Sequence, residues 1–409
     1  MSFQTGLSGL NASSRSLDVI GNNIANANTT GMKSSRAEFG DLVASSLGVG
    51  GGGTNAGIGV AVNAIAQQFT QGNINTTGNS LDVAINGGGF FQLTQPDGST
   101  AYTRDGSFKL DKDGYIKTNT GANVMGYPTD KVGNAISVTP QNLQLPTSAP
   151  IAASATTLIT AEFNLDARAP VAATQVPPTP RTTYGTSLTV FDSQGAQVPV
   201  SLYFERMDPS GTAPAVVDNW DVYDVATAGT PLFTMSFDAA GKLVSPATSP
   251  TLTVSTPSTV TPEISATLDI SKVTQFGSSF AVSNLTQDGY APGELTGLSI
   301  GESGVITTRY SNGQTQSAGQ IMLVDFRNVQ GLSPLGGNAW AATYDSGLPV
   351  QGKAGDGKFG ALRAGALEES NVDLTSELVN MMTAQRSYQA NAQTIKTQDQ
   401  VMSTLVNLR

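Results

Sequence analysis

The sequence contains neither cysteine nor histidine among its 409 residues. Without cysteine the chain cannot form disulfides or thiolate metal sites. Without histidine it cannot form Ser/His/Asp or Cys/His nucleophile pairs or histidine-based metal sites. Catalysis would have to use carboxylates, lysine, tyrosine or serine, and no cluster of these residues stands out. We therefore expect no enzyme, no catalytic residue, no cofactor and no bound metal.

Charge is also scarce, because Asp, Glu, Lys and Arg make up only 13% of the residues and leave a net charge of -10. Nonspecific affinity for nucleic acid comes from clustered Lys and Arg, so we expect no nucleic-acid partner. No apolar run approaches the ~20 residues needed to span a bilayer, so we expect no membrane insertion. The N-terminus lacks the positive-then-apolar order of a cleaved secretory signal.

The most regular apolar pattern lies in residues 365–409. Alternating steps of four and three predict one long amphipathic helix with a heptad seam, and Ser370 followed by Asp373 predicts a capping box at its start. The seam has two polar members, Gln385 and Asp399, which we expect to face a wet channel or to fix register. Its apolar members are Leu374, Leu378, Met381, Tyr388, Ile395, Met402 and Val406.

Residues 1–27 carry the same spacing in a weaker form. Gly6, Gly9 and Gly21 each cost about 1 kcal/mol of helix propensity relative to alanine, so this helix should be marginal alone. We expect its partner to be the C-terminal seam, in the same chain or in a neighbouring copy; an ordinary pair of terminal helices on one domain is the alternative. The N-terminal stripe consists of Phe3, Leu7, Leu10, Leu17 and Ile24.

An Asn-rich segment follows and predicts the end of this helix, because asparagine side chains bond their own backbone and glycine tolerates positive φ. The turn consists of Asn26, Asn28, Thr30, Gly31, Met32 and Lys33. It resembles closely the N-terminal motif of flagellar axial proteins of the rod, hook and hook–filament junction, in which an Asn-rich helix end precedes Thr-Gly-aromatic-Lys. Met32 departs from that pattern, since the family usually carries Phe or Tyr there.

The interior of the chain predicts β-structure. Residues 78–93 and 102–116 alternate apolar and polar positions and break at Asp-Gly pairs, and residues 188–204 and 231–246 each read as strand, turn and strand. The fold class expected is mainly β, with nested discontinuous β-domains of sandwich or barrel type carried on two terminal helices that form a coiled coil. The expected domains are 1–27 with 366–409 (helical), 28–71 (a linker with short strands), 72–149 with 289–365 (intermediate β) and 150–288 (inserted outer β).

Read as a whole, the chain resembles the hook members of the flagellar axial family across nearly its entire length. The resemblance is carried by residues 78–93, 102–116, 289–295, 310–313 and 365–393, and is loosest between 150 and 285. It implies a helical homopolymer of the extracellular hook, a universal joint that transmits torque, exported by the flagellar type III apparatus without a cleaved signal. The distal rod protein, the hook–filament junction protein and the hook cap protein are the further partners that it implies.

Two alternatives remain open. A distal rod or junction protein would also polymerise, but the large β insertion fits it poorly. A secreted carbohydrate-active enzyme or binding module is the unrelated alternative, and the terminal heptads would then be unexplained.

Overall fold

The computed structural model describes residues 2–43, 57–147, 150–175, 177–211, 216–227, 229–256 and 260–407. The chain divides into two compact units. Unit 1 consists of Met1–Ser148, Gly297–Thr308 and Thr315–Arg409, and unit 2 consists of Ala149–Thr296 and Arg309–Gln314. The expectation of a mainly β chain with one helix at each end is confirmed. Neither helix in the described residues is long and apolar enough to cross a membrane.

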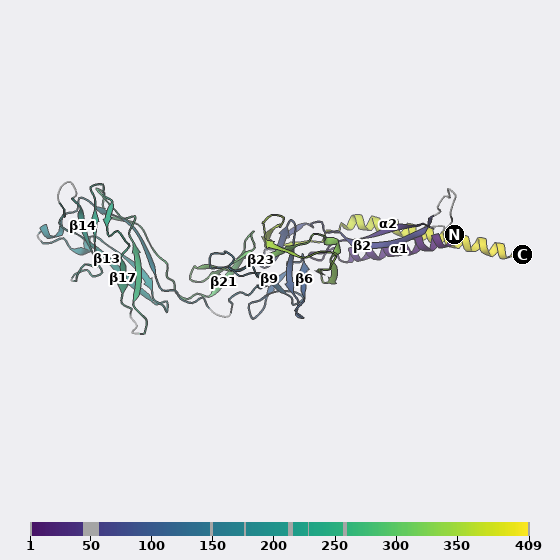
Figure 1. The fold of residues 1–409 in the computed structure, drawn as a ribbon, viewed down its shortest axis with the longest axis horizontal. Helices are drawn as coiled ribbons and strands as arrows, with labels where there is room; N and C mark the ends of the chain where they lie inside the picture. The colour runs from purple at the N-terminus through teal and green to yellow at the C-terminus, as the bar shows by residue number, and fades with distance from the viewer. Residues whose placement is uncertain are drawn as a thin grey trace. The chain divides into compact units, whose positions relative to one another are not determined.

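The described residues of unit 1 form two α-helices, α1 (Ser2–Ala25) and α2 (Leu374–Asn407). At about 1.5 Å per residue the 34 residues of α2 extend over roughly 50 Å, so α2 is much longer than the 24-residue α1. Helix α1 ends at the Asn-rich segment as expected, where Asn26 donates its backbone and side-chain N–H groups to the carbonyl of Asn22. Figure 1 shows the two helices side by side.

A long antiparallel hairpin follows the Asn-rich turn, made of β1 (Ser35–Val43) and β2 (Gly57–Gln67). Both strands pack on α1. The strand expected from the alternation of Ile58, Val60 and Val62 lies within β2, and both strands are longer than the short strands expected for residues 28–71. Most of the glycine run in the expected linker lies outside the described residues.

Besides the β1–β2 hairpin, the described residues of unit 1 form one large sheet and two small ones. The large sheet has the order β21 (Leu295–Ile300), β22 (Val305–Tyr310), β23 (Thr315–Asp325), β9 (Asn123–Tyr127), β5 (Phe90–Thr94), β6 (Thr100–Thr103), β25 (Ala339–Ala341) and β24 (Ser333–Gly336). Strands β7 (Phe108–Leu110), β8 (Ile116–Thr118), β10 (Gln141–Asn142) and β26 (Val350–Lys353) pair alongside this path. The small sheets pair β27 (Ala361–Ala364) with β4 (Val83–Asn86), and β28 (Ala366–Glu368) with β3 (Ile74–Thr76).

The core of unit 1 is rich in aromatic rings next to the start of the terminal segments. Phe90 meets Trp340 edge to face with 5.7 Å between ring centroids, and Phe69, which follows β2, meets both rings in the same way. Such pairs add roughly 0.5–1.5 kcal/mol each beyond their area burial. Residues just after the hairpin are therefore fixed to the β-sheet by packing.

Unit 2 contains two five-stranded sheets that share one core. One sheet has the order β17 (Thr251–Val254), β18 (Ile264–Asp269), β11 (Leu158–Asp166) and β19 (Thr274–Phe276), with β20 (Ala281–Gln287) also on β11. The other has the order β12 (Gly185–Phe191), β13 (Gln197–Arg206), β14 (Asp218–Tyr223), β15 (Phe233–Phe237) and β16 (Leu243–Ser245). Phe163 of the first sheet and Phe204 of the second pack with ring centroids 4.6 Å apart, and buried Trp220 belongs to the same core.

The turn expected at the Asp113-Gly114 pair and the turns expected within residues 188–204 and 231–246 are confirmed. Gly114 donates to the carbonyl of Asp111, and Gly195 and Gly241 donate to the carbonyls of Asp192 and Asp238. All three glycines have φ between 74° and 82°, the left-handed region that these turns require. The expected division of the chain into four nested domains stays a prediction.

Candidate functional site

Helices α1 and α2 form an antiparallel pair, which we call the terminal pair. Asn23 near the end of α1 donates to Glu377 near the start of α2 at 3.2 Å, while Gly6 near the start of α1 faces Ile395. A Cβ added at Gly9 would come within 2.9 Å of the Asn391 amide. Two of the three glycines that weaken α1, Gly6 and Gly9, therefore allow the two helices to approach closely.

The structure places the predicted seam residues partly inside and partly outside the helix contact. Leu10, Leu17, Ile24, Met381 and Ile395 are half-buried. Phe3 and Val406 lie within the helices, but their side chains are outside the described residues. The exposed members are Leu7, Leu374, Leu378, Tyr388 and Met402, together with the polar pair Gln385 and Asp399.

An apolar strip of α2 is uncovered within the chain. Leu374, Leu378 and Met382 recur every four residues, so they share one side of the helix, and we call them the α2 ridge. Their exposed fractions are 42%, 51% and 52%. The strip lies beside, and not at, the face that contacts α1 through Glu377, Asn391 and Ile395. Helix α2 therefore has one face that α1 covers and, beside it, an apolar face that is uncovered. Such a helix is suited to bind a second partner.

The start of α2 differs from the capping box expected at Ser370. Asp373 is the N-cap residue, because its carboxylate accepts the backbone N–H groups of Thr375 at 2.9 Å and Ser376 at 3.3 Å. These bonds lower the pKa of Asp373, first through the backbone of Ser376. Ser370 instead accepts from the backbone of Val372, before the helix begins. The capping-box prediction was wrong because the helix begins directly after Asp373, which leaves Ser370 outside it.

The turn after α1 is fixed to the β-domain by Thr30 and Gly31. The Thr30 hydroxyl donates to Asp105 at 3.0 Å, and its carbonyl accepts from Asn338 at 2.7 Å. Gly31 has φ of 68°, and a Cβ there would lie 2.5 Å from the backbone nitrogen of Asp105. Only glycine both adopts this positive φ readily and lacks a Cβ that would overlap Asp105, which explains why the motif has glycine at this position.

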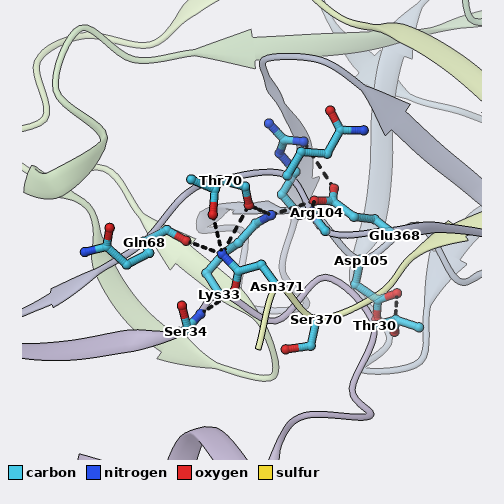
Figure 2. A network of polar contacts seen from close by, with 12 residues as sticks. Thr30, Lys33, Ser34, Gln68, Thr70, Arg104, Asp105, Glu368, Ser370 and Asn371 are labelled. Atoms are coloured by element: carbon cyan, nitrogen blue, oxygen red, sulfur yellow. Dashed lines mark hydrogen bonds and ion pairs between the residues drawn. The ribbon is translucent and has the colours of Figure 1, made fainter. Parts of the chain in front are cut away.

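Lys33 of the same turn lies in a buried group of charges with Arg104 and Glu368, which we call the charged triad. Lys33 Nζ is 2.6 Å from Glu368 Oε1, and Arg104 Nη1 is 3.1 Å from Glu368 Oε2. The side chains of Lys33 and Glu368 are 0% exposed and that of Arg104 is 6% exposed. Figure 2 shows Lys33 and Arg104 with Glu368 and the polar residues around them. Burial lowers the pKa of Lys33, an effect that Glu368 partly offsets.

Two asparagines near the charged triad each form a pair of hydrogen bonds with backbone groups, as a neighbouring peptide group would. Asn23 accepts from the backbone N–H of Ser35 at 2.9 Å and donates to the carbonyl of the same residue at 2.8 Å. Asn371 accepts from Ser34 at 2.7 Å and donates to the carbonyl of Gln68 at 2.7 Å. The Asn-rich helix end thus does more than stop α1, since Asn23 also holds β1 against α2.

The other members of the predicted turn have local roles. Asn26 bonds back to Asn22, Asn28 is exposed, and Met32 is half-buried. Sequence reasoning missed Asn23, Arg104, Glu368 and Asn371. Two features of the sequence could have indicated them. These residues lie within the segments that carry the family resemblance, and charged residues are few in this chain. Within the described residues no group of three or more acidic side chains could hold a metal ion.

Comparison with known proteins matches four families along the chain. They are described as flagella basal body rod protein (residues 3–33), flagellar hook protein FlgE/F/G D1 domain (84–160), flagellar basal body protein FlaE D2 domain (164–290) and flagellar basal body rod FlgEFG protein C-terminal (363–408). The flagellar hook protein FlgE of Escherichia coli (strain K12) is 41% identical, and the match covers all of both chains. The chain belongs to the flagellar hook protein FlgE family.

Other members of the hook family are similar over the whole chain. FlgE of Rhizobium meliloti (strain 1021) is 35% identical and matched over 98% of its length, and FlgE of Treponema pallidum (strain Nichols) is 33% identical and matched over 99%. The crystal structure of Helicobacter pylori hook protein FlgE2 has a TM-score of 0.55 and 16% identity, covering 72% of this chain and all of that one. This last likeness concerns the fold. The family is a structural one, in keeping with the absence of a nucleophile pair in the sequence.

Proposed function

We propose that this hook subunit polymerises with copies of itself into a flexible helical tube whose inner layer is made of terminal pairs. The observation that carries the proposal is the α2 ridge, an apolar strip left uncovered on a helix that already has one partner within the chain. A neighbouring copy is the natural occupant, because membership of the hook family implies self-assembly. Burying one such side chain contributes about 1.5–3 kcal/mol.

The proposed inner layer also uses the predicted seam residues. Phe3, Leu7, Leu10, Leu17 and Ile24 of α1 would act with Leu374, Leu378, Met381, Tyr388, Ile395, Met402 and Val406 of α2. A helical tube needs a heterologous interface, in which one patch of a subunit meets a different patch of the next. Exposed Gln385 and Asp399 would face the central channel or fix the register of neighbouring helices.

The β-domains would form the outer layers of the tube. Residues 150–288 would lie outermost and slide between axial neighbours as the tube bends, and residues 72–149 with 289–365 would form the shell between. Low-charge polar contacts suit this sliding, since they can be exchanged without separating a fused core. In this way the tube would transmit torque as a universal joint.

The partners proposed beyond the chain itself follow from this place in the flagellum. The hook would meet the distal rod protein at one end and the hook–filament junction protein at the other, with the hook cap protein present during growth. The subunit would reach its extracellular position through the flagellar type III export apparatus, without a cleaved signal.

Electron microscopy of the purified chain after salting out tests the proposal. Wild-type protein should form supercoiled tubes, and Leu378→Ser with Met382→Ser should stay dispersed while both units remain folded. Val401→Ser is the matched control, because Val401 is 46% exposed on the same helix but lies about 140° around the helix from Leu378. Straight tubes would favour a rod subunit, and equal assembly of ridge and control variants would remove the ridge from the interface.

A further inference from the structure

We propose that the charged triad of Lys33, Arg104 and Glu368 is a positioning device that fixes the terminal pair in one orientation on the β-domain. The inference deepens the proposed polymerisation and rests on it. The three charges come from segments far apart in the chain: Lys33 follows α1, Arg104 follows β6, and Glu368 ends β28. The triad therefore forms only when the N-terminal turn, the β-domain and the C-terminal return meet correctly.

The three charges contribute more to the specificity of this arrangement of segments than to its stability. Two cations share one carboxylate at a site that excludes water, and Arg104 Nε has no hydrogen-bond partner among the described residues. A well-packed apolar group would stabilise such a site at least as well, because desolvation offsets most of the attraction between buried ions. Any other arrangement of the three segments would leave a buried ion uncompensated, which is far more costly.

The pairing of β28 with β3 shows how sharply the register is set. Glu368 lies opposite Ile74, and Leu367 lies opposite Asn75. A slip of one residue turns every side chain of a strand to the other face. If the slip brings Leu367 to the register position of Glu368, an apolar side chain replaces the carboxylate and both cations lose their partner. The triad therefore disfavours that slip, whereas a slip in the other direction would bring Glu369, a second carboxylate, to the same position.

The triad also holds both places where the chain crosses between the β-domain and the terminal segments. On the first crossing, Lys33 Nζ donates to the carbonyl of Thr70 at 2.8 Å, and the N–H of Gly72 donates to Glu368 Oε1 at 3.0 Å. On the second, the carbonyl of Glu368 accepts from the N–H of Gly31 at 2.8 Å. Arg104 connects the group to the sheet by donating to the carbonyl of Gly87 at 2.9 Å.

This position determines what the triad does for assembly. The α2 ridge can meet a neighbouring copy repeatedly along a helix only if every subunit presents it in the same orientation. A hinge at the crossings would let the terminal pair rotate on the β-domain, whereas a buried network that joins both crossings prevents that rotation. Rigid presentation also lets force pass from the helices to the β-domain.

Spin labels provide a direct measurement, because the chain has no native cysteine. Arg386→Cys on α2 and Lys112→Cys on the β-domain are exposed positions of unit 1, and the distance between the labels reports the orientation of the terminal pair. The otherwise native double-label protein should give one narrow distance distribution. Glu368→Gln and the milder Lys33→Met should each broaden it roughly twofold or more, since the junction then opens locally. Lys109→Met, which removes an exposed lysine of the same domain, should leave it unchanged.

Hydrogen exchange on the same variants separates positioning from general unfolding. Amides of residues 30–35 and 366–371 should exchange on the order of 100-fold faster in Glu368→Gln, while those of β5 and β23 should keep native protection. A narrow distribution in both triad variants, together with normal tubes, would overturn the inference. Failure of the native chain to form tubes would instead count against the proposed function, whatever the distances show.

Discussion

The Nζ atom of Lys33 lies 2.6 Å from Oε1 of Glu368, and neither side chain is exposed to solvent. The two residues are separated by most of the sequence, so this contact joins the N-terminal turn to the C-terminal return. Arg104 binds the other carboxylate oxygen. Among the described residues, Glu368 therefore has two cationic partners and each cation has one anionic partner, so the variants of the triad should differ accordingly.

Glu368→Gln should destabilise unit 1 more than Lys33→Met does. Removing one partner from a buried ion pair costs about 3–5 kcal/mol, and loss of Glu368 leaves two cations uncompensated, whereas loss of Lys33 leaves Glu368 with Arg104. Urea unfolding followed by Trp340 fluorescence in a Trp220→Phe background reports unit 1 alone, since Trp220 belongs to unit 2. The reverse order of stability would show that the carboxylate is not the centre of the network.

Gly31→Ala should disrupt the same junction through the backbone. Alanine costs about 1–2 kcal/mol in the left-handed region, and its Cβ would also overlap the backbone nitrogen of Asp105. Gly78→Ala is the control, because Gly78 has φ of 78° but no atom within 4 Å of the added Cβ. Thermal unfolding should show a clearly larger loss for Gly31→Ala than for Gly78→Ala. Equal losses would mean that close approach to Asp105 has no role.

Alanine substitutions at two glycines of α1 should also differ in their effect on stability, according to the space around each glycine. Gly21→Ala should stabilise α1 by about 1 kcal/mol, because the added Cβ meets no atom within 4 Å. At Gly9 the Cβ would press on the Asn391 amide, so Gly9→Ala should gain less or weaken the terminal pair. Hydrogen exchange of α1 amides measures both effects. Equal slowing of exchange in the two variants would contradict close packing at Gly9.

Acid should weaken the start of α2 through Asp373. The pKa of Asp373 is lowered by hydrogen bonds from the backbone of Ser376 and Thr375, so its stabilising contribution is present above the ordinary value of 3.8. It is lost as the pH falls through the lowered pKa of the folded state. Asp373→Asn keeps a capping acceptor that does not titrate. Circular dichroism between neutral and acid pH should show a smaller loss of helix in the variant, whereas identical curves would contradict the capping role.

Periodicity predicted the two helices but only part of the face by which they meet. The seam from Leu374 predicted one long helix at this end of the chain, because apolar spacing and the lack of Gly and Pro act locally, but the expected start at Ser370 was wrong. The contact with α1 includes Ile395 of that seam together with Glu377 and Asn391, which are not seam members. Glycine and asparagine shape the contact by allowing close approach, and a search for apolar residues alone cannot find this part of it.

The charged triad could not be predicted for a different reason. Arg104 lies in a segment that the sequence placed correctly as β-structure, whereas Glu368 ends β28 in a segment that was expected to be helical. The burial of both residues depends on segments far apart in the chain meeting in space. Turns at Asp-Gly pairs, by contrast, are fixed by neighbouring residues, and these were predicted. Local rules thus gave the elements, while the junction that positions them follows only from the tertiary structure.

The most direct test of the central claim is cryo-electron microscopy of tubes grown from the full chain, at a resolution that separates helices. We expect a tube whose inner layer consists of α1 and α2, with Leu374, Leu378 and Met382 buried against a neighbouring copy. A tube in which the terminal pairs lie on the outside, or in which the α2 ridge remains in contact with solvent, would contradict it.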